Sequence, residues 1–570
     1  MRKPSTRSIP LLSLFLLLIT TITAAADTLK IAPQYYHIDH KKKIVLVNKK
    51  LTSINSEASR VKSHIGLDAA YTFSQPVSQV RTNSSYQVKL DDVAYTVYFT
   101  QLPVLSIGAR QPIVDTPSRY ARFALVQSEG PVVASGMGIE IRGGSSQTNP
   151  KKSYELSFWA DTTGASSRDV SMLGMRTDNK YNLQALYNEP LRVHSKVSNA
   201  LWQEIHQIYY KSLEPDAKNG IALEYVELFI NDEYQGIYTL GERVDRKQLK
   251  LKKYNNDIVG ELYKGTYWDG PVVFTSLSPY DNSSAVWGGF EYKHPTEQID
   301  WRNLYDFVDF VENSSDQVFY STYQQKFKLS NAVDYYIFLN LTRAADNTGK
   351  NLYIAKYKKG EPYYYVPWDL DGVFGNDWTG TATGPMNDIL SNGFYDRLLK
   401  DCAPNGFRAL LRSRWAELRT TVVTEDHIMA KFRANTTYLA TNNTYEREHL
   451  AWNGFRADTT QLAYISTWLS SRLRFLDATF SQACAPMAAM PSAPARLLKL
   501  YPNPTSDYLF VEFEGAPFEL IIRNMSGREV LRTTLKGTRN QVDIRQLGKG
   551  LYVVTVQSPT AVRTEKLLIN

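Results

Sequence analysis

The chain has 570 residues, of which 43% are hydrophobic and 21% are charged. That length allows two or more domains, and that composition is typical of globular proteins, which excludes a largely disordered chain. The net charge of +8 at pH 7 becomes +5 if residues 1–26 are removed, because that segment holds three basic residues and no acidic ones. So small a surplus, spread over the remaining chain, predicts no nucleic-acid partner.

The first 26 residues have the pattern of a secretory signal peptide. Arg2, Lys3 and Arg7 form a basic start, an apolar run follows over 11–22, and three alanines end the segment. The apolar run is too short to span a bilayer, and no later stretch is long enough. We therefore expect the mature protein to begin near Asp27, to leave the cytoplasm and to hold no transmembrane segment.

Residues 27–102 are predicted to form a β-rich accessory module. Three runs, 43–50, 84–92 and 93–102, alternate polar and apolar residues or are rich in β-branched and aromatic residues, which favours strands. None of these runs carries a recognisable catalytic pattern. We therefore assign no chemistry to this module.

A larger α+β unit is predicted over 103–484. Its first strands are expected at 102–108, 120–127 and 136–143, and a glycine- and hydroxyl-rich turn separates the last of these from a strand at 154–159. Backbone N–H groups of such a turn can wrap a phosphate, and a lysine just after it can reach the charge. The candidate phosphate-binding residues are Arg142, Gly143, Gly144, Ser145, Ser146 and Lys152. Because the spacing matches no established phosphate loop, a plain β-hairpin with a surface lysine is the alternative.

The middle of this unit is predicted to place a helix before a hairpin. Residues 188–210 have a helical apolar face with Pro190 near the start. Residues 225–245 contain two strands joined by an Asn-Asp-Glu turn, and Glu242 ends the second strand. Further helices are expected at 387–401, 407–423 and 460–480. This order, strands first and helices later, predicts two lobes with a site between them.

The stretch 344–375 holds the residues with the clearest chemistry. An apolar helix leads into Asp346, and Asn351 follows five positions later. Two short strands are then expected, followed by Asp369 and Asp371. The predicted order is helix, carboxylate loop, hairpin and second carboxylate loop.

Such an arrangement supplies the groups that phosphoryl transfer requires. One carboxylate must receive or orient the attacking hydroxyl, and a carboxylate with an amide must hold the metal ion that neutralises the phosphates. Asp346 suits the first role, and Asn351 with Asp369 suits the second. The same order is found in the catalytic and metal loops of protein kinases. Asp, Asn and Gly are also common in turns, so two ordinary turns are the competing interpretation.

The rest of the chain predicts one covalent link and one further domain. Cys402 and Cys484, the only two cysteines, could form a long-range disulfide in an exported protein, and they are too few to predict a structural zinc site. Residues 485–497 are rich in Ala and Pro and predict a linker. Residues 498–570 return to strands with regular turns, which predicts a small β-sandwich.

Four blocks of the large unit stand in the order found in one known family. They are IRGGSSQTNPKKSYEL (141–156), VELFINDEYQGIYTLGERVD (226–245), DNTGKNLYI (346–354) and VPWDLDGVFG (366–375). With these blocks the unit resembles the CotH family of atypical kinases. The resemblance implies a divergent, two-lobed, protein-kinase-like fold. It also implies a transferase that uses ATP and Mg²⁺ or Mn²⁺ to phosphorylate Ser or Thr of secreted or surface proteins.

The same resemblance implies a role for each candidate residue. Asp346 is expected to be the catalytic aspartate, Asn351 and Asp369 the metal ligands, and Asp371 an accessory ligand. Lys152 is expected to bind the ATP phosphates. Arg142 and the turn Gly143–Ser146 are expected to cover the nucleotide, and Glu242 falls where the hinge between lobes would run. Glu204 and Glu189 both stand as candidates for the glutamate that pairs with the lysine.

The C-terminal segment resembles a second family. The opening YPNPTSDYL (501–509) and the closing GKGLYVVTV and KLLIN match the type A sorting domain of the type IX secretion system. This implies that the type IX machinery carries the chain across the outer membrane. The product would then be released or held at the cell surface, with the sorting domain cleaved.

Two other functions compete with a secreted kinase. ATP is scarce outside the cytoplasm, so the kinase-like unit could instead be a non-catalytic surface or matrix-binding protein. A carbohydrate-active enzyme using Asp369 and Asp371 as its acid and base is the third possibility. Carboxylates two residues apart lie too close together to flank a glycosidic bond, which argues against it.

Overall fold

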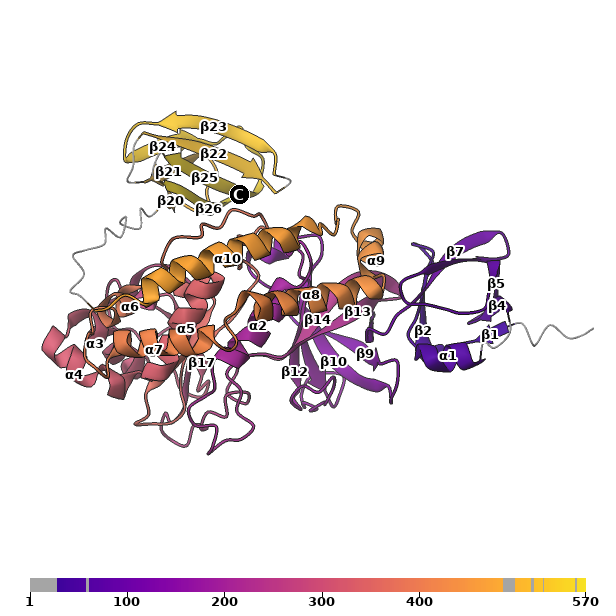
Figure 1. Ribbon diagram of the computed structural model, residues 1–570, viewed down its shortest axis with the longest axis horizontal. Helices are drawn as coiled ribbons and strands as arrows, with labels where there is room; N and C mark the ends of the chain where they lie inside the picture. Colours follow the sequence, from indigo (N-terminus) through magenta and orange to yellow (C-terminus); the bar gives the residue numbers. More distant parts are fainter. Residues whose placement is uncertain (1–27, 58–60, 485–497, 514–516, 526, 559–560) are drawn as a thin grey trace, which may run out of the picture.

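The computed structural model describes residues 28–57, 61–484, 498–513, 517–525, 527–558 and 561–570 (Figure 1). The predicted signal peptide and linker lie outside the described residues. The described part is a mixed α+β structure that ends in a β-rich C-terminal region, as the sequence predicted. No helix in this part combines the length and the apolar character needed to cross a bilayer.

The N-terminal module is a seven-stranded sheet in the order β1-β4-β5-β6-β7-β3-β2. Its strand β3 is buried on both faces, because Val45 and Val47 enter the core of the module while Ile44 and Leu46 pack against the next domain. The elements are β1 Thr28–Lys30, β2 Tyr36–Asp39, β3 Ile44–Val47, α1 Leu51–Glu57, β4 Lys62–Gly66, β5 Ala70–Val77, β6 Ser85–Leu90 and β7 Val93–Phe99.

The next part is a closed barrel in the order β10-β11-β12-β14-β13-β8-β9. The predicted hairpin is confirmed: Asn231 and Asp232, both with left-handed backbones (φ 50° and 62°), join β13 to β14, a turn that suits the twist of paired strands. The strands are β8 Val104–Ala109, β9 Arg119–Val126, β10 Val133–Arg142, β11 Ser153–Trp159, β12 Lys180–Gln184, β13 Leu223–Ile230 and β14 Glu233–Gly241.

The third part packs helices against the five-stranded sheet β16-β17-β15-β18-β19. Helix α5 is almost entirely buried, as expected for a helix that is apolar on every side. The strands are β15 Glu261–Gly265, β16 Val286–Trp287, β17 Phe290–His294, β18 Leu352–Lys356 and β19 Tyr363–Pro367. The helices are α2 His194–Ile205, α3 Arg302–Asn313, α4 Asp316–Lys326, α5 Leu329–Thr342, α6 Gly393–Leu398, α7 Phe407–Arg419, α8 Glu425–Thr441, α9 Thr444–Ala451 and α10 Thr460–Phe480.

Some predicted helices are shorter, and others were missed. Helix α2 starts only at His194, because the preceding residues form a turn in which Arg192 has a φ of 60°. The helix expected over 387–401 is limited to α6, whose Asn392 caps it by accepting from the N–H of Tyr395. The short polar helix α9 was not predicted, since its charged side chains are buried in ion pairs.

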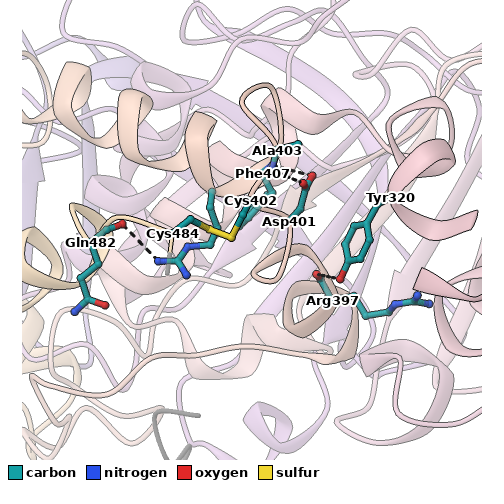
Figure 2. The surroundings of a disulfide bond; sticks show 9 residues. Tyr320, Arg397, Asp401, Cys402, Ala403, Phe407, Gln482 and Cys484 are labelled. Atoms are coloured by element: carbon teal, nitrogen blue, oxygen red, sulfur yellow. Dashed lines mark hydrogen bonds between the residues drawn. A yellow bond between two sulfur atoms is a disulfide. The ribbon is translucent and has the colours of Figure 1, made fainter. Parts of the chain in front are cut away.

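Cys402 and Cys484 form the disulfide that the sequence allowed, with Cα atoms 5.6 Å apart. Figure 2 shows the bond next to Asp401, whose carboxylate accepts from the N–H groups of Ala403 and Phe407 at 3.0 and 3.2 Å. The bond therefore ties the loop after α6 to the segment that follows α10, at the end of the core.

The C-terminal domain consists of the sheets β20-β21-β24 and β23-β22-β25-β26, whose apolar side chains share one core. In Figure 1 it lies above α10, with β26 on the side that faces the rest of the chain. Its strands are β20 Lys499–Tyr501, β21 Tyr508–Glu512, β22 Phe518–Asn524, β23 Glu529–Leu535, β24 Arg539–Asp543, β25 Gly550–Ser558 and β26 Ala561–Ile569.

Candidate active site

The two predicted acidic loops meet because of the β18–β19 hairpin. Strand pairing sets Leu352 opposite Pro367, so that Asn351 and Trp368 flank the same end of the hairpin. The N–H of Trp368 donates to the carbonyl of Asn351 at 2.9 Å. The buried amide of Asn347 donates to both carbonyls, that of Asn351 at 2.6 Å and that of Trp368 at 2.9 Å. The register of the hairpin and this one amide bring the loops together.

A cavity of about 460 Å³, within the usual range for ligand pockets, opens beside these loops. It is lined by the four acidic-loop residues and by the glycine-rich turn between β10 and β11. The predicted residues on its wall are Arg142, Gly143, Gly144, Ser145, Ser146, Asp346, Asn351, Asp369 and Asp371. Residues of the turn and of the acidic loops, about 200 to 230 positions apart in sequence, are thus brought to one cavity.

The backbone at two of these residues is unusual. Asn351 has a φ of 58° and Asp369 a φ of 57°, both in the left-handed region. Asn and Asp tolerate this conformation better than other residues with a side chain. Such backbone conformations cluster at functional sites, where the surrounding structure holds them in place.

Two of the carboxylates, those of Asp346 and Asp371, sit in an environment that raises their pKa. Burial raises the pKa of Asp346, and Asp369 raises it further, while the ammonium groups of Lys566 and Lys350 oppose the shift. Burial also raises the pKa of Asp371 well above its ordinary value, helped by the charge of Asp369. Acidic groups crowded in this way attract cations.

The available ligands suit a magnesium ion better than a metal ion that is held by protein side chains alone. Among the described residues, no three His, Cys, Asp or Glu side chains come together as a ready-made metal site. Mg²⁺ is commonly bound through one or two carboxylates, with substrate phosphates and water completing its shell. Asn351, Asp369 and Asp371 offer oxygen ligands of that kind on the cavity wall.

The turn that faces the acidic loops depends on a glycine. Gly143 has a φ of 117°, and a Cβ atom there would lie 2.1 Å from the Oγ of Ser146. A larger residue is therefore excluded while the turn keeps this shape. The guanidinium of Arg142 lies over the ring of Trp368 at 5.5 Å, which connects the turn to the second acidic loop.

Two neighbouring lysines follow this turn, and of these two only Lys151 lines the cavity. Lys152 donates to the carbonyl of Gln147 at 2.6 Å and is not part of the described cavity wall. Lys151 is part of that wall, and its ammonium pairs with Glu448 of α9 at 2.7 Å. Arg192 also contacts Glu448, at 3.0 Å. Burial lowers the pKa of Lys151 to about 7, while Glu448 opposes this shift.

The three glutamates considered from sequence lie in different places. Glu189 is part of the cavity wall and bonds with Ser195, and burial raises its pKa to about 7. Glu204 pairs with His427 and Lys431, and Glu242 is buried and accepts from Lys218 at 2.8 Å. Neither Glu204 nor Glu242 is among the described residues that form the cavity wall.

Comparisons with known proteins identify the families that the chain matches. Residues 139–476, more than half of the chain, match the family described as CotH kinase protein. The chain belongs to that family. Residues 499–570 match the family described as Secretion system C-terminal sorting domain, which indicates that this CotH-family protein is exported. Both resemblances predicted from the sequence are confirmed. A search of curated proteins gives no match.

Sequence reasoning missed several residues at the site of this CotH-family chain. Lys151 was passed over for its neighbour, although the pair Lys151-Lys152 was itself the visible signal. Asn347 was seen only as part of a turn. Glu448 lies about 300 positions after Lys151, and no local pattern connects the two. Lys566, of the sorting domain, also lines the cavity.

Proposed function

We propose that this protein is an exported kinase that transfers the γ-phosphate of ATP to Ser or Thr of secreted or surface proteins. Its active site would be a kinase-like cleft between the barrel and the helical part. One observation carries the proposal: Asp346, Asn351 and Asp369 share a single cavity with Lys151 and the glycine-rich turn. A base, metal ligands and a cation for phosphate are the parts that phosphoryl transfer requires.

Each residue has one task in this proposal. Bound Mg²⁺ would neutralise charge on the phosphates, and Asn351 and Asp369 would hold it, with Asp371 in support. Asp346 would accept the proton of the attacking hydroxyl. Its raised pKa suits this task, because a carboxylate whose pKa lies closer to neutral is the stronger base.

The opposite wall of the cavity would hold the phosphates. Backbone N–H groups of the turn 143–146 can donate to phosphate oxygens, and Arg142 adds a fixed positive charge. We place Lys151 in the role that the sequence suggested for Lys152, because Lys151 lines the cavity and pairs with a buried glutamate. In this proposal Glu448 is the glutamate that pairs with the lysine, a role for which the sequence left Glu204 and Glu189 as candidates.

A second candidate is an exported binding protein that transfers nothing. It is favoured by the bonding of Lys151, whose fully buried ammonium already contacts Glu448 and the carbonyl of Ile237. A lysine held in this way could be structural. Nucleotide binding separates the two candidates.

The test uses the chain from Asp27 to Asn570 with γ-labelled ATP and Mg²⁺ or Mn²⁺. We expect a thermal shift with metal and nucleotide together, and transfer of label to the protein or to a mixed protein substrate. Asp346→Asn should reduce transfer by about 10²–10⁴-fold and leave nucleotide binding intact, whereas Asp369→Asn should weaken metal-dependent binding. Asp257→Asn, at an exposed ion pair with Lys359, is the matched control and should change neither. Absence of any nucleotide-dependent shift would favour the binding protein.

A further inference from the structure

The sorting domain covers the cavity just described. Met525, Leu551 and Lys566 belong to this domain, and all three line the cavity together with the acidic loops. Strand β26, which carries Lys566, is an edge strand of its sheet and lies on the side that faces the core (Figure 1). The sorting domain is thus part of the wall of a site that belongs to another domain.

Lys566 contacts the other domain directly. Its ammonium donates to the Oγ of Ser145 at 3.0 Å and lies 3.8 Å from the ring centre of Trp378. It thus bridges the glycine-rich turn and the segment after the second acidic loop. The carboxylates that act on its charge are Asp346, Asp369 and Asp371.

The backbone that carries Lys566 is held by its own domain. The amide of Asn503 donates to the carbonyl of Lys566 at 2.6 Å and accepts from the N–H of Leu568 at 2.9 Å. Asn503 belongs to the Tyr-Pro-Asn-Pro opening of the domain. Lys566 is therefore presented by a fixed strand.

We propose that the sorting domain is an intramolecular inhibitor of the cleft, with the Lys566 ammonium occupying the place beside the acidic loops that a metal–nucleotide complex needs. The consequence for catalysis rests on the proposed kinase function. The docking itself does not, because it rests on the contacts of Lys566 with Ser145 and Trp378.

The electrostatics set a cost on this docking. Burial lowers the pKa of Lys566, and the neighbouring carboxylates only oppose that effect. Burial and the charge of Asp346 raise the pKa of Glu565 to about 7. Docking therefore carries an unfavourable desolvation of two charged groups. Because Lys566 and a divalent cation would neutralise the same carboxylates, each must weaken binding of the other by the same factor.

Docking can be measured without any catalytic assay. Both native cysteines are in the disulfide, so introduced cysteines supply the free thiols. In a Ser146→Cys/Met525→Cys chain, two cavity-lining positions from different domains should be joined by a short bis-maleimide. Adding Lys566→Ala should reduce the yield several-fold. Pairing Ser146→Cys with Lys536→Cys, after the far edge strand β23, should give no link. A Ser146–Met525 link that is absent, or that does not change with Lys566→Ala, would overturn the proposal.

The inhibitory effect is tested with Mn²⁺ alone and then with Mn²⁺ and ATP. If the tail is docked in about nine chains of ten, apparent affinity is about ten-fold weaker than in the open form. Lys566→Ala should therefore bind Mn²⁺ about ten-fold more tightly than the wild type. Lys566→Arg, which keeps the charge, should resemble the wild type, as should the exposed control Lys536→Ala. Equal Mn²⁺ affinity for Lys566→Ala and wild type overturns inhibition.

Failure of the kinase proposal would look different. In that case Lys566→Ala would neither bind ATP nor transfer phosphate, while the Ser146–Met525 link would still form and would still depend on Lys566. Failure of the docking proposal would instead leave ATP binding and transfer insensitive to Lys566. Mn²⁺ affinity and transfer are measured on wild type, Lys566→Ala, Lys566→Arg and Lys536→Ala. The link is measured on the Ser146→Cys/Met525→Cys chain with and without Lys566→Ala, and together these measurements keep the two outcomes apart.

Discussion

Replacing Glu448 by glutamine should destabilise the core by about 3–5 kcal/mol, the loss typical when one partner of a buried ion pair is removed. Glu448 is fully buried. One carboxylate oxygen accepts from Lys151 at 2.7 Å and from Arg192 at 3.0 Å, and the other accepts from the N–H of Ile237 at 2.7 Å. Glutamine keeps the shape but not the charge, so two buried cations would stand together without a counter-ion.

The partner substitution should cost less. In Lys151→Met, Glu448 keeps its contacts with Arg192 and Ile237, and we expect a loss of about 1–3 kcal/mol from the missing hydrogen bond. The double variant should lose less than the sum of the two single losses, because the residues are in direct contact. Nucleotide binding should weaken in both single variants if Lys151 contacts phosphate.

Urea unfolding followed by tryptophan fluorescence gives these losses from midpoint shifts at unchanged slope. Glu417→Gln is the matched control, since Glu417 is an exposed residue of α7 that pairs with Arg414 at 2.7 Å. Removing a surface pair should change stability by less than about 1 kcal/mol. Equal losses for Glu448→Gln and Glu417→Gln would refute the reasoning, and so would strict additivity in the double variant.

Three further predictions follow from single features. The disulfide closes a separation of 82 residues, so Cys402→Ser/Cys484→Ser should lower the unfolding free energy by up to about 4.5 kcal/mol; an unchanged urea midpoint would contradict this. Burial raises the pKa of Glu189 from 4.5 to about 7, so the stability that its protonated form contributes is present below pH 4.5 and lost as pH rises towards 7. Between pH 4.5 and pH 7, the unfolding free energy of Glu189→Gln should therefore rise by about 3 kcal/mol relative to that of the wild type. A difference in unfolding free energy that does not change with pH would argue against it. Asn347→Ala should cost about 1–3 kcal/mol and weaken Mn²⁺ binding, because it frees the two carbonyls that tie the acidic loops; the idea fails if calorimetry shows unaltered Mn²⁺ affinity.

Local sequence patterns predicted much of the fold. The order of helix α5, acidic loop, hairpin and second acidic loop over 329–371 is as expected, because an apolar helix and two short β-branched and aromatic strands are strong local signals. The Asn-Asp turn between β13 and β14 was recognised for the same reason. Helices α3, α4, α8 and α9 were not predicted. For α9 the reason is that the charged residues Arg447 and Glu448 gain their partners only after distant segments fold.

The sequence by itself determined the family and the sorting domain, and it indicated the residue types of the candidate site: carboxylates, an amide, and a glycine-rich turn followed by lysines. These are written in short, contiguous motifs. Tertiary structure alone decided that Lys151 lines the cavity while Lys152 does not, because the partner that selects it, Glu448, arrives on a helix about 300 residues later. It also decided that Lys566 of the last strand contacts the glycine-rich turn and lines the same cavity as the acidic loops. Contacts between such distant segments depend on how whole domains pack, and local periodicity and spacing carry no information about that packing.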